Sequence, residues 1–280
     1  MTLLRVLAYN LYFGGTDRVD AILAVLRHAG ADVVALTEAD DARVVATLAE
    51  GLEMRHVWER GSGDRHIATL SRFPIVESRI YNTPPLTQAV LETRIEMPHP
   101  PTPSPETGSL VSGEEGRGGE AITLYNVHFL PYLLLPYEIR RWQAVGRLLG
   151  VIRSRRPGPH VILGDLNAIA PRDRVLQRNN PPRMRRVMAL QINLIFRLAI
   201  PRLLGAGYVD CFRRLHPGED GFTWRPGSRT TRYDYILADP ALAPALRSCR
   251  VVDDVQAVNA ASDHFPLLAE FDMTAVKRDT

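Results

Sequence analysis

Lysine, cysteine and long apolar runs are scarce in this chain of 280 residues. Lys277 is the only lysine, so the other 33 basic residues are arginines. The two cysteines, Cys211 and Cys249, have no CxxC spacing, which excludes a disulfide framework and predicts two small buried thiols that suit a reducing compartment. No apolar segment reaches the ~20 residues that cross a bilayer, and the N-terminus lacks the basic start and apolar core of a signal peptide. We therefore expect a soluble, cytoplasmic protein.

The overall composition is that of an ordinary globular protein, with 45% hydrophobic and 23% charged residues. A chain of this length fits one large α/β unit and buries well over half of its unfolded surface. We expect a single domain over residues 1–273 and a short tail at 274–280. Residues 98–120 differ, because five prolines in the first eight positions precede a stretch rich in glycine, serine and glutamate. Such a segment buries too little apolar surface to offset its ordering entropy, so we interpret it as a flexible loop joining two adjacent strands.

Strand-like and helix-like patterns alternate along the chain. A first helix is expected between Asp17, which can cap it as Thr16 also can, and Gly30, which can end it. Two more are expected at 40–52 and 136–155, the latter with Trp142 on its inner face. Strands are predicted at 3–9, 32–37, 55–59, 66–72, 75–81, 88–97, 121–128, 160–164, 208–212, 222–225, 232–238, 249–255 and 266–271. Helices on both sides of two runs of strands predict a layered α/β sandwich.

Acid, amide and histidine side chains stand where these strands end. The positions are Asn10, Glu38, His128, Asp165, Asn167, Asp234, Asp263 and His264. One such residue after a strand is usually a turn residue or a hydrogen-bonded core residue. Eight together are different, because burying each without a partner costs ~1–3 kcal/mol. We expect them to converge at one edge of a sheet, where they could bind a metal ion and transfer protons during hydrolysis of a phosphate ester.

Seven short segments give the chain a close resemblance to the endonuclease/exonuclease/phosphatase superfamily, which has the deoxyribonuclease I-like fold. They are AYN at 8–10, LTE at 36–38, LSRFPI at 70–75, NVHF at 126–129, GDLN at 164–167, RYDYIL at 232–237 and SDH at 262–264. The resemblance implies a four-layered α/β/β/α sandwich, with two packed, mainly antiparallel mixed sheets flanked by helices. It also implies a metal-dependent phosphoester hydrolase. One residue departs from the family's pattern, since His66 stands where a small residue is usual, and we expect it to pack.

The resemblance assigns Asn10, Glu38 and Asp263 to a metal site. Glu38 looks like the main ligand, Asn10 like a second ligand or an orienter of Glu38, and Asp263 like a ligand or water orienter on the other side. Mg²⁺ fits, with Mn²⁺ as a substitute, because a hard cation prefers one or two carboxylates plus waters and phosphate oxygens. The ion would polarise the phosphoryl oxygen and stabilise developing charge.

The other five residues resemble the family's catalytic groups. Asp165 looks like the group that positions and deprotonates the attacking water, and Asn167, two residues on, can hydrogen-bond the phosphate or that water. Asp234 and His264 resemble an Asp–His dyad, in which the carboxylate favours the cationic imidazole. Either Asp165 or His264 could therefore be the general base. His128 resembles the histidine that contacts the phosphate and assists the leaving group.

These motifs belong to the family's shared chemistry and leave three functions open. The first is a nuclease or phosphodiesterase of nucleic acid, favoured by eight arginines against one acid between Arg172 and Arg202, within a basic helical insertion that we expect at 172–205. The second is a lipid-directed phosphodiesterase or phosphatase on an anionic lipid surface, because 183–200 is basic and apolar and residues 132–135 could add an apolar tip. The third, a catalytically silent binding module, is disfavoured by the eight intact polar positions. We expect a monomer.

Overall fold

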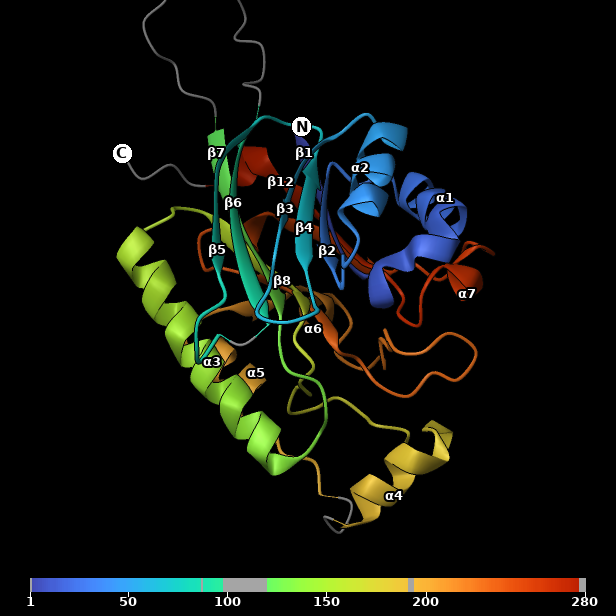
Figure 1. The fold of residues 1–280 in the computed structure, drawn as a ribbon. Helices are drawn as coiled ribbons and strands as arrows, with labels where there is room; N and C mark the ends of the chain where they lie inside the picture. The colour runs from blue at the N-terminus through green and yellow to red at the C-terminus, as the bar shows by residue number, and fades with distance from the viewer. Residues whose placement is uncertain (1, 87, 98–119, 191–193, 277–280) are drawn as a thin grey trace, which may run out of the picture.

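Two six-stranded sheets pack face to face, and helices cover their outer faces in the computed structural model (Figure 1). The structure describes residues 2–86, 88–97, 120–190 and 194–276. The loop expected at 98–120 lies outside these residues except for Glu120, as does most of the expected tail. The first sheet has the order β11 (Leu246–Val251), β12 (Leu267–Asp272), β1 (Leu3–Asn10), β2 (Val33–Thr37), β4 (Ile67–Ser71) and β3 (Arg55–Glu59). The second has the order β5 (Ile75–Tyr81), β6 (Ala89–Met97), β7 (Glu120–His128), β8 (His160–Asp165), β10 (Asp234–Ala238) and β9 (Val209–Asp210).

Each sheet has one parallel pair near its centre, and the other pairs are antiparallel. β1 and β2 are joined through the short helix η1 (Phe13–Arg18) and helix α1 (Val19–Ala29), and β7 and β8 through α3 (Leu135–Arg155). Gly30 ends α1 in the left-handed conformation, which glycine adopts without strain. Because parallel strands point the same way, the residues that follow β1, β2, β7 and β8 lie at one edge of the sandwich.

The core between the sheets is built by every second residue of the central strands. In β1 these are Leu4, Val6 and Ala8, which pack with Ile122 and Leu124 of β7. Both cysteines are buried in the same layer, as expected of small apolar groups. The alternate residues of each strand face outward and pack against the helices. The expected four-layered sandwich is therefore confirmed.

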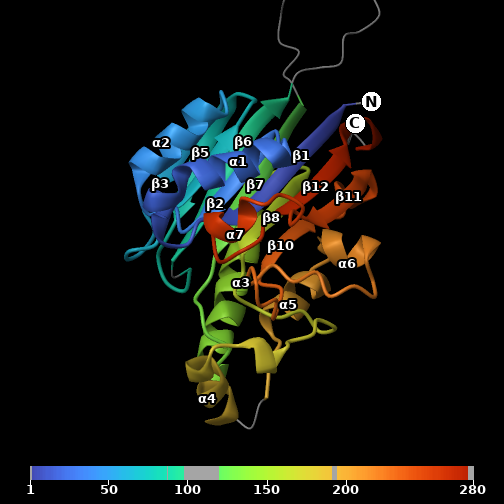
Figure 2. The same ribbon diagram turned by 90° about the vertical axis from the view of Figure 1, so that its right-hand side faces the viewer.

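The helices divide between the two outer faces. α1, α2 (Ala42–Gly51) and α7 (Val258–Ala261) cover the first sheet, whereas α3 and α5 (Ala199–Gly205) cover the second. α6 (Cys211–Leu215) follows β9, and α4 (Pro182–Leu190) stands away from the sheets in both views (Figures 1 and 2). The remaining short helices are η2 (Gln177–Asn179), η3 (Ala243–Ala245) and η4 (Met273–Ala275). Among the described residues, no helix combines the length and apolarity that a membrane crossing requires.

The structure corrects three local expectations. Residues 222–225 form no strand, and Trp224 makes only isolated bridges there. The strand expected at 208–212 has two residues and turns into α6. Trp142 is 43% exposed and does not lie on the inner face of α3, where Glu138 and Arg141 are buried as an ion pair at 2.8 Å. Helical periodicity predicted that the apolar Trp142 faces inward. A hydrophobic pattern takes no account of the carboxylate and carbonyl oxygens that can satisfy a buried arginine.

We expect Asn126 to stabilise the contact between the sheets. Its buried amide nitrogen donates to the carbonyls of Leu36 (3.1 Å) and Ala68 (2.8 Å) in the opposite sheet. Replacing Asn126 by Ala should lower the free energy of unfolding by about 1–3 kcal/mol, because two buried bonds are lost. Urea denaturation measures this, with the exposed Ser78→Ala on β5 as control. A loss below about 0.5 kcal/mol, the level of an ordinary surface substitution, would contradict it.

Candidate active site

The alternation that builds the core also delivers polar groups to the end of the inter-sheet layer. Asn10 follows Ala8 on the same face of β1, and Asp165 follows Leu163 on the same face of β8. In β7 the apolar Leu124 is followed by Asn126 and then His128, whereas Asp234 precedes Ile236 in β10. The apolar layer thus becomes polar at one edge, and the structure brings the predicted residues together there.

Asn10 joins the two sheets at this edge. Its amide nitrogen donates to Glu38 Oε1 at 3.2 Å and to Asp165 Oδ2 at 2.9 Å. His128 Nε2 lies 3.9 Å from Glu38 Oε1 and 3.8 Å from Asp165 Oδ2. Ser262 secures the backbone behind the site, because its hydroxyl donates to the carbonyl of Asn10 and accepts from the backbone N–H of His264. These contacts connect the carboxylate that follows β2 with the one that ends β8.

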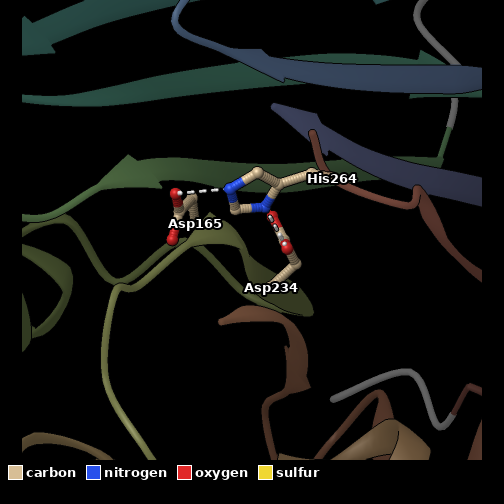
Figure 3. A group of neighbouring side chains, drawn as sticks. All are labelled: Asp165, Asp234 and His264. Atoms are coloured by element: carbon tan, nitrogen blue, oxygen red, sulfur yellow. Dashed lines mark hydrogen bonds and ion pairs between the residues drawn. The ribbon is translucent and has the colours of Figure 1, made fainter. Parts of the chain in front are cut away.

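His264 lies between two buried carboxylates (Figure 3). Its Nδ1 is 2.8 Å from Asp234 Oδ2, and its Nε2 is 3.9 Å from Asp165 Oδ2. Asp263 Oδ1 is also 3.9 Å from Nε2, whereas Asp263 Oδ2 accepts from the indole N–H of Trp224. The structure therefore places Asp234, Asp263 and His264 in one group with Asp165.

The charges of this group shift its pKa values strongly. Burial alone lowers the pKa of His264, but the carboxylates of Asp234, Asp165 and Asp263 outweigh burial and raise it to about 10. Burial and the charge of Asp234 hold the pKa of Asp165 well above its ordinary value. The geometry thus pairs a cationic imidazole with a carboxyl group that titrates much nearer neutrality than an ordinary aspartate.

On the other side of Asn10, the pKa values of Glu38 and His128 are lowered, whereas those of Asp165 and His264 are raised. Burial raises the pKa of Glu38, but the nearby His128, the N–H of Phe13 and Arg65 outweigh it, and the net pKa is lowered. Burial lowers the pKa of His128 to about 4. Glu38 is therefore ionised and His128 neutral near pH 7, so the negative charge of Glu38 is available to a cation.

Two groups of side chains could hold a metal ion. Asp165, Asp234 and His264 offer three ligand atoms within 4.8 Å of one another. The bond to Asp234 occupies Nδ1 of His264, however, and a protonated imidazole has no free lone pair for a metal. The carboxylates of Glu38 and Asp263, by contrast, line one cleft, and the buried Asp263 Oδ1 has no hydrogen-bond partner. Asn10 turns its amide nitrogen to Glu38 and its oxygen to the N–H of Tyr12, so it orients Glu38 and offers no oxygen to an ion beside that carboxylate. Oxygen ligands of this kind fit a hard divalent cation.

Asn167 and His66 complete the set of predicted positions. Asn167 donates its backbone N–H to Asp165 Oδ1 at 2.9 Å and its side-chain amide to the carbonyl of Phe129 at 3.0 Å, so it orients Asp165. The ring of His66 lies edge-on to Trp58 with centroids 5.2 Å apart and does not line the cleft. It packs, as expected.

A cleft of about 240 Å³ opens over these groups. Sequence reasoning did not assign eight of its fourteen lining residues to the site, because none of the eight is an acid or histidine that interrupts or follows an apolar strand. Its lining combines six of the predicted residues, namely Glu38, His128, Asp165, Asn167, Asp263 and His264, with Tyr12, Phe13, Arg65, Gln88, Pro131, Tyr132, Trp224 and Tyr233. The only sequence feature that pointed to the eight other lining residues was the aromatic content of the segments next to the motifs.

The raised pKa of His264 predicts a specific pH dependence of stability. An imidazole with a folded-state pKa of about 10 and an ordinary value of 6.5 stabilises the fold fully below pH 6.5, and this stabilisation is lost as pH rises towards 10. With a chelator present, the free energy of unfolding should fall more steeply between pH 7 and 10 in the wild type than in His264→Gln. His128→Gln is the control, because a lowered pKa has no effect in that window. Parallel curves for the wild type and His264→Gln would contradict the assignment.

Comparisons with known proteins agree with this geometry. A model of the Endonuclease/Exonuclease/phosphatase family matches residues 7–264. Exodeoxyribonuclease III of Haemophilus influenzae is 30% identical over 126 residues, which are 41% of this chain and 47% of that protein, so the match spans about half the length of the relative. A 3′ phosphatase from Neisseria bound to a product DNA hairpin has a TM-score of 0.68 at 18% identity, covering 96% of this chain and 99% of that one. An AP endonuclease from Archaeoglobus fulgidus gives 0.68 at 19%, with the same coverage. The chain belongs to the endonuclease/exonuclease/phosphatase family.

Proposed function

We propose that this family phosphoesterase is a metal-dependent phosphodiesterase that cleaves nucleic acid by attack of an activated water. The proposal depends on one observation, which is that Asp165 lies between the proposed cation site and the cationic His264. It lies 2.9 Å from Asn10, which also contacts Glu38, and 3.9 Å from the cationic His264. A phosphate group in the cleft would therefore meet a cation site on one side and a proton-transfer group on the other.

Glu38 and Asp263 would hold the cation and Asn10 would orient Glu38; Mg²⁺ is our choice of cation and Mn²⁺ a substitute. When bound, it supplies charge stabilisation to the phosphoryl oxygens. The protein's own part is to keep Glu38 ionised. It does so with the N–H of Phe13 at 3.0 Å from Oε2 and the amide of Asn10 on Oε1.

Asp165 is the better candidate for the general base. His264 is held in its charged form by Asp234, and a protonated imidazole cannot accept a proton. Asp165 has a raised pKa, which suits a group that takes a proton from water near neutral pH. In this scheme the water oxygen attacks phosphorus and one of its protons passes to Asp165. The bond to the leaving oxygen breaks, and that oxygen keeps the bonding electron pair and takes up a proton from solvent. His264 donates to the phosphate, and the neutral His128 contacts it.

Nucleic acid is the favoured substrate class. The similar proteins include an exodeoxyribonuclease and a 3′ phosphatase bound to a product DNA hairpin, and both names refer to DNA. The basic segment adds support, because Arg183, Arg185 and Arg186 are all exposed on α4. α4 lies beyond the edge of the sandwich at which β1, β7 and β8 end (Figures 1 and 2).

The lipid-directed alternative receives less support. It relied on a basic and apolar helix over 183–200 and on an apolar tip at 132–135. Of the tip, Tyr132 and Leu135 are exposed and Leu133 is buried. The helix is not continuous, because α5 is separated from α4 and buries Ala199, Ile200 and Leu203 against the second sheet and α3. Apolar side chains used in this way are not available to a lipid surface. A lipid-directed enzyme would hydrolyse sphingomyelin or phosphoinositides in place of DNA or RNA.

Activity should require a divalent cation and Asp165. Hydrolysis of bis(p-nitrophenyl) phosphate and of oligonucleotides is expected with Mg²⁺ or Mn²⁺ and should vanish with excess chelator.

Asp165→Asn should lower kcat at least ~100-fold, because it removes a proton acceptor. The control is Asp239→Asn, which removes a buried carboxylate at the other end of β10. It should lose stability and keep activity. Full turnover with chelator, or a loss below tenfold in Asp165→Asn, would refute the assignments.

The arginines of α4 should contribute to binding through phosphate contacts. Replacing Arg183, Arg185 and Arg186 by Gln is expected to weaken oligonucleotide binding and to reduce the slope of log K against log salt by about 2, since each phosphate contact in a single strand contributes about 0.7. Fluorescence anisotropy at several salt concentrations measures the slope. A charge-matched control replaces Arg43, Arg55 and Arg79, which lie on α2, β3 and β5. An equal slope in both triple variants would exclude α4 from the binding surface.

A further inference from the structure

Exposed aromatic side chains gather at the mouth of the cleft. In the described part of the chain four large aromatics are exposed: Phe13 (58%), Tyr132 (53%), Trp142 (43%) and Tyr12 (41%). All except Trp142 line the cleft. A single exposed aromatic needs no explanation, but three around one small cleft form an apolar surface beside a site full of charges.

The same residues have unusual backbone conformations. Tyr12 and Phe13 both have a φ of 53°, and Tyr132 has 77°, a region that bulky side chains rarely adopt. Of the eight non-glycine residues with positive φ among those described, six line the cleft. Backbone strain of this kind typically collects at binding and catalytic sites. The loops are therefore held in strained conformations that present aromatic rings to the cleft.

On the first-sheet side, the aromatics are hydrogen-bonded to Glu38 and to Asn10, which orients it. The backbone N–H of Tyr12 donates to Asn10 Oδ1 at 2.8 Å, and that of Phe13 donates to Glu38 Oε2 at 3.0 Å. Their rings meet edge-on at 4.6 Å, and the guanidinium of Arg65 lies 4.2 Å from the centre of the Phe13 ring. These contacts fix the rings before a substrate arrives, which reduces the entropy lost on binding.

On the second-sheet side, a buried ion pair holds the loop that carries Tyr132. Arg141 donates to the carbonyls of Leu130 at 2.6 Å and Tyr132 at 2.9 Å, while pairing with Glu138 at 2.8 Å. Glu138 also accepts the backbone N–H groups of Leu198 and Ala199. Arg141 is thus a positioning residue for this wall of the cleft.

The cleft offers few contacts to a phosphate backbone. Among the described residues that line it, Arg65 is the only arginine or lysine. A site that bound both strands of a duplex would need many cationic side chains, because duplex binding comes largely from phosphate contacts. Aromatic rings instead bind the faces of unpaired bases by stacking. A duplex hides those faces within its stack.

We propose that the cleft binds unpaired nucleotides, with one base stacked on Phe13 and another on Tyr132 across the scissile phosphate, and that the substrate is single-stranded nucleic acid. The inference rests on the proposed phosphodiesterase function and specifies its substrate. Phe13 begins η1 shortly after β1, and Tyr132 stands on the loop after β7, so the two rings follow strands of opposite sheets.

The test compares variants on single-stranded and duplex oligonucleotides of equal length. Phe13→Ala and Tyr132→Ala should each raise KM for the single strand about tenfold, the lower part of the range for one stacked base. Tyr132→Phe, which keeps the ring, should behave like the wild type. Trp142→Ala removes an aromatic of similar exposure outside the cleft and should change KM less than twofold. Thermal unfolding of each variant checks that the fold is intact.

Binding separates this inference from the proposed function. In the Asp165→Asn background with Mg²⁺, anisotropy of a labelled oligothymidylate should show tighter binding than its duplex, and Phe13→Ala or Tyr132→Ala should weaken it about tenfold. That result without any cleavage by the wild type would remove the phosphodiesterase function and keep the single-strand site. Equal or tighter binding of duplex, or alanine variants that match Trp142→Ala, would overturn the inference even if the enzyme cleaves DNA.

Discussion

The side-chain amide of Asn10 donates to Glu38 and Asp165, and the arrangement of the candidate site depends on this pair of bonds. Glu38 follows the first sheet and Asp165 ends a strand of the second, so one amide fixes the distance between two carboxylates that would otherwise repel each other. The remaining oxygen of Asn10 is occupied by the N–H of Tyr12, which leaves the amide a single orientation. A change in the relative position of the two sheets would therefore also change the geometry of the site.

Asn126 marks the place where apolar packing between the sheets is replaced by hydrogen bonds near the site. It stands on β7 between the apolar Leu124 and the polar His128, and its amide bonds to two carbonyls of the opposite sheet. Apolar side chains hold the sheets together over most of the layer, and directional bonds take over where the site begins. Because those bonds depend on angle as well as distance, they fix the register of the sheets more closely than apolar contact does.

Much of the fold and half of the cleft could be predicted from sequence. The strand ends are recognisable because an acid, amide or imidazole interrupts an apolar run, and the alternation of the pleat places Asn10 and Asp165 on the inner face. Trp142 was misplaced, because an apolar ring carries no information on whether it packs inside or stands exposed. The strand expected at 222–225 is reduced to isolated bridges of Trp224. Arg65 and Arg141 were not singled out, since their roles depend on carboxylates and carbonyls distant in sequence, such as Asp40 and Tyr132.

His128, Asp165 and Asp234 stand in strands of the second sheet, whereas the exposed aromatic rings of the cleft stand outside the strands, and this difference has a physical basis. Carboxylates and imidazoles that share protons need separations fixed to tenths of an ångström, and the ladder of a sheet provides this rigidity. Aromatic rings that receive a base tolerate larger displacements, because stacking depends weakly on position across a flat face. Loops can therefore carry Phe13 and Tyr132, provided that something limits their freedom. The hydrogen bonds to Glu38 and from Arg141 do so here, and they connect the surface that would select a substrate to the groups that would cleave it.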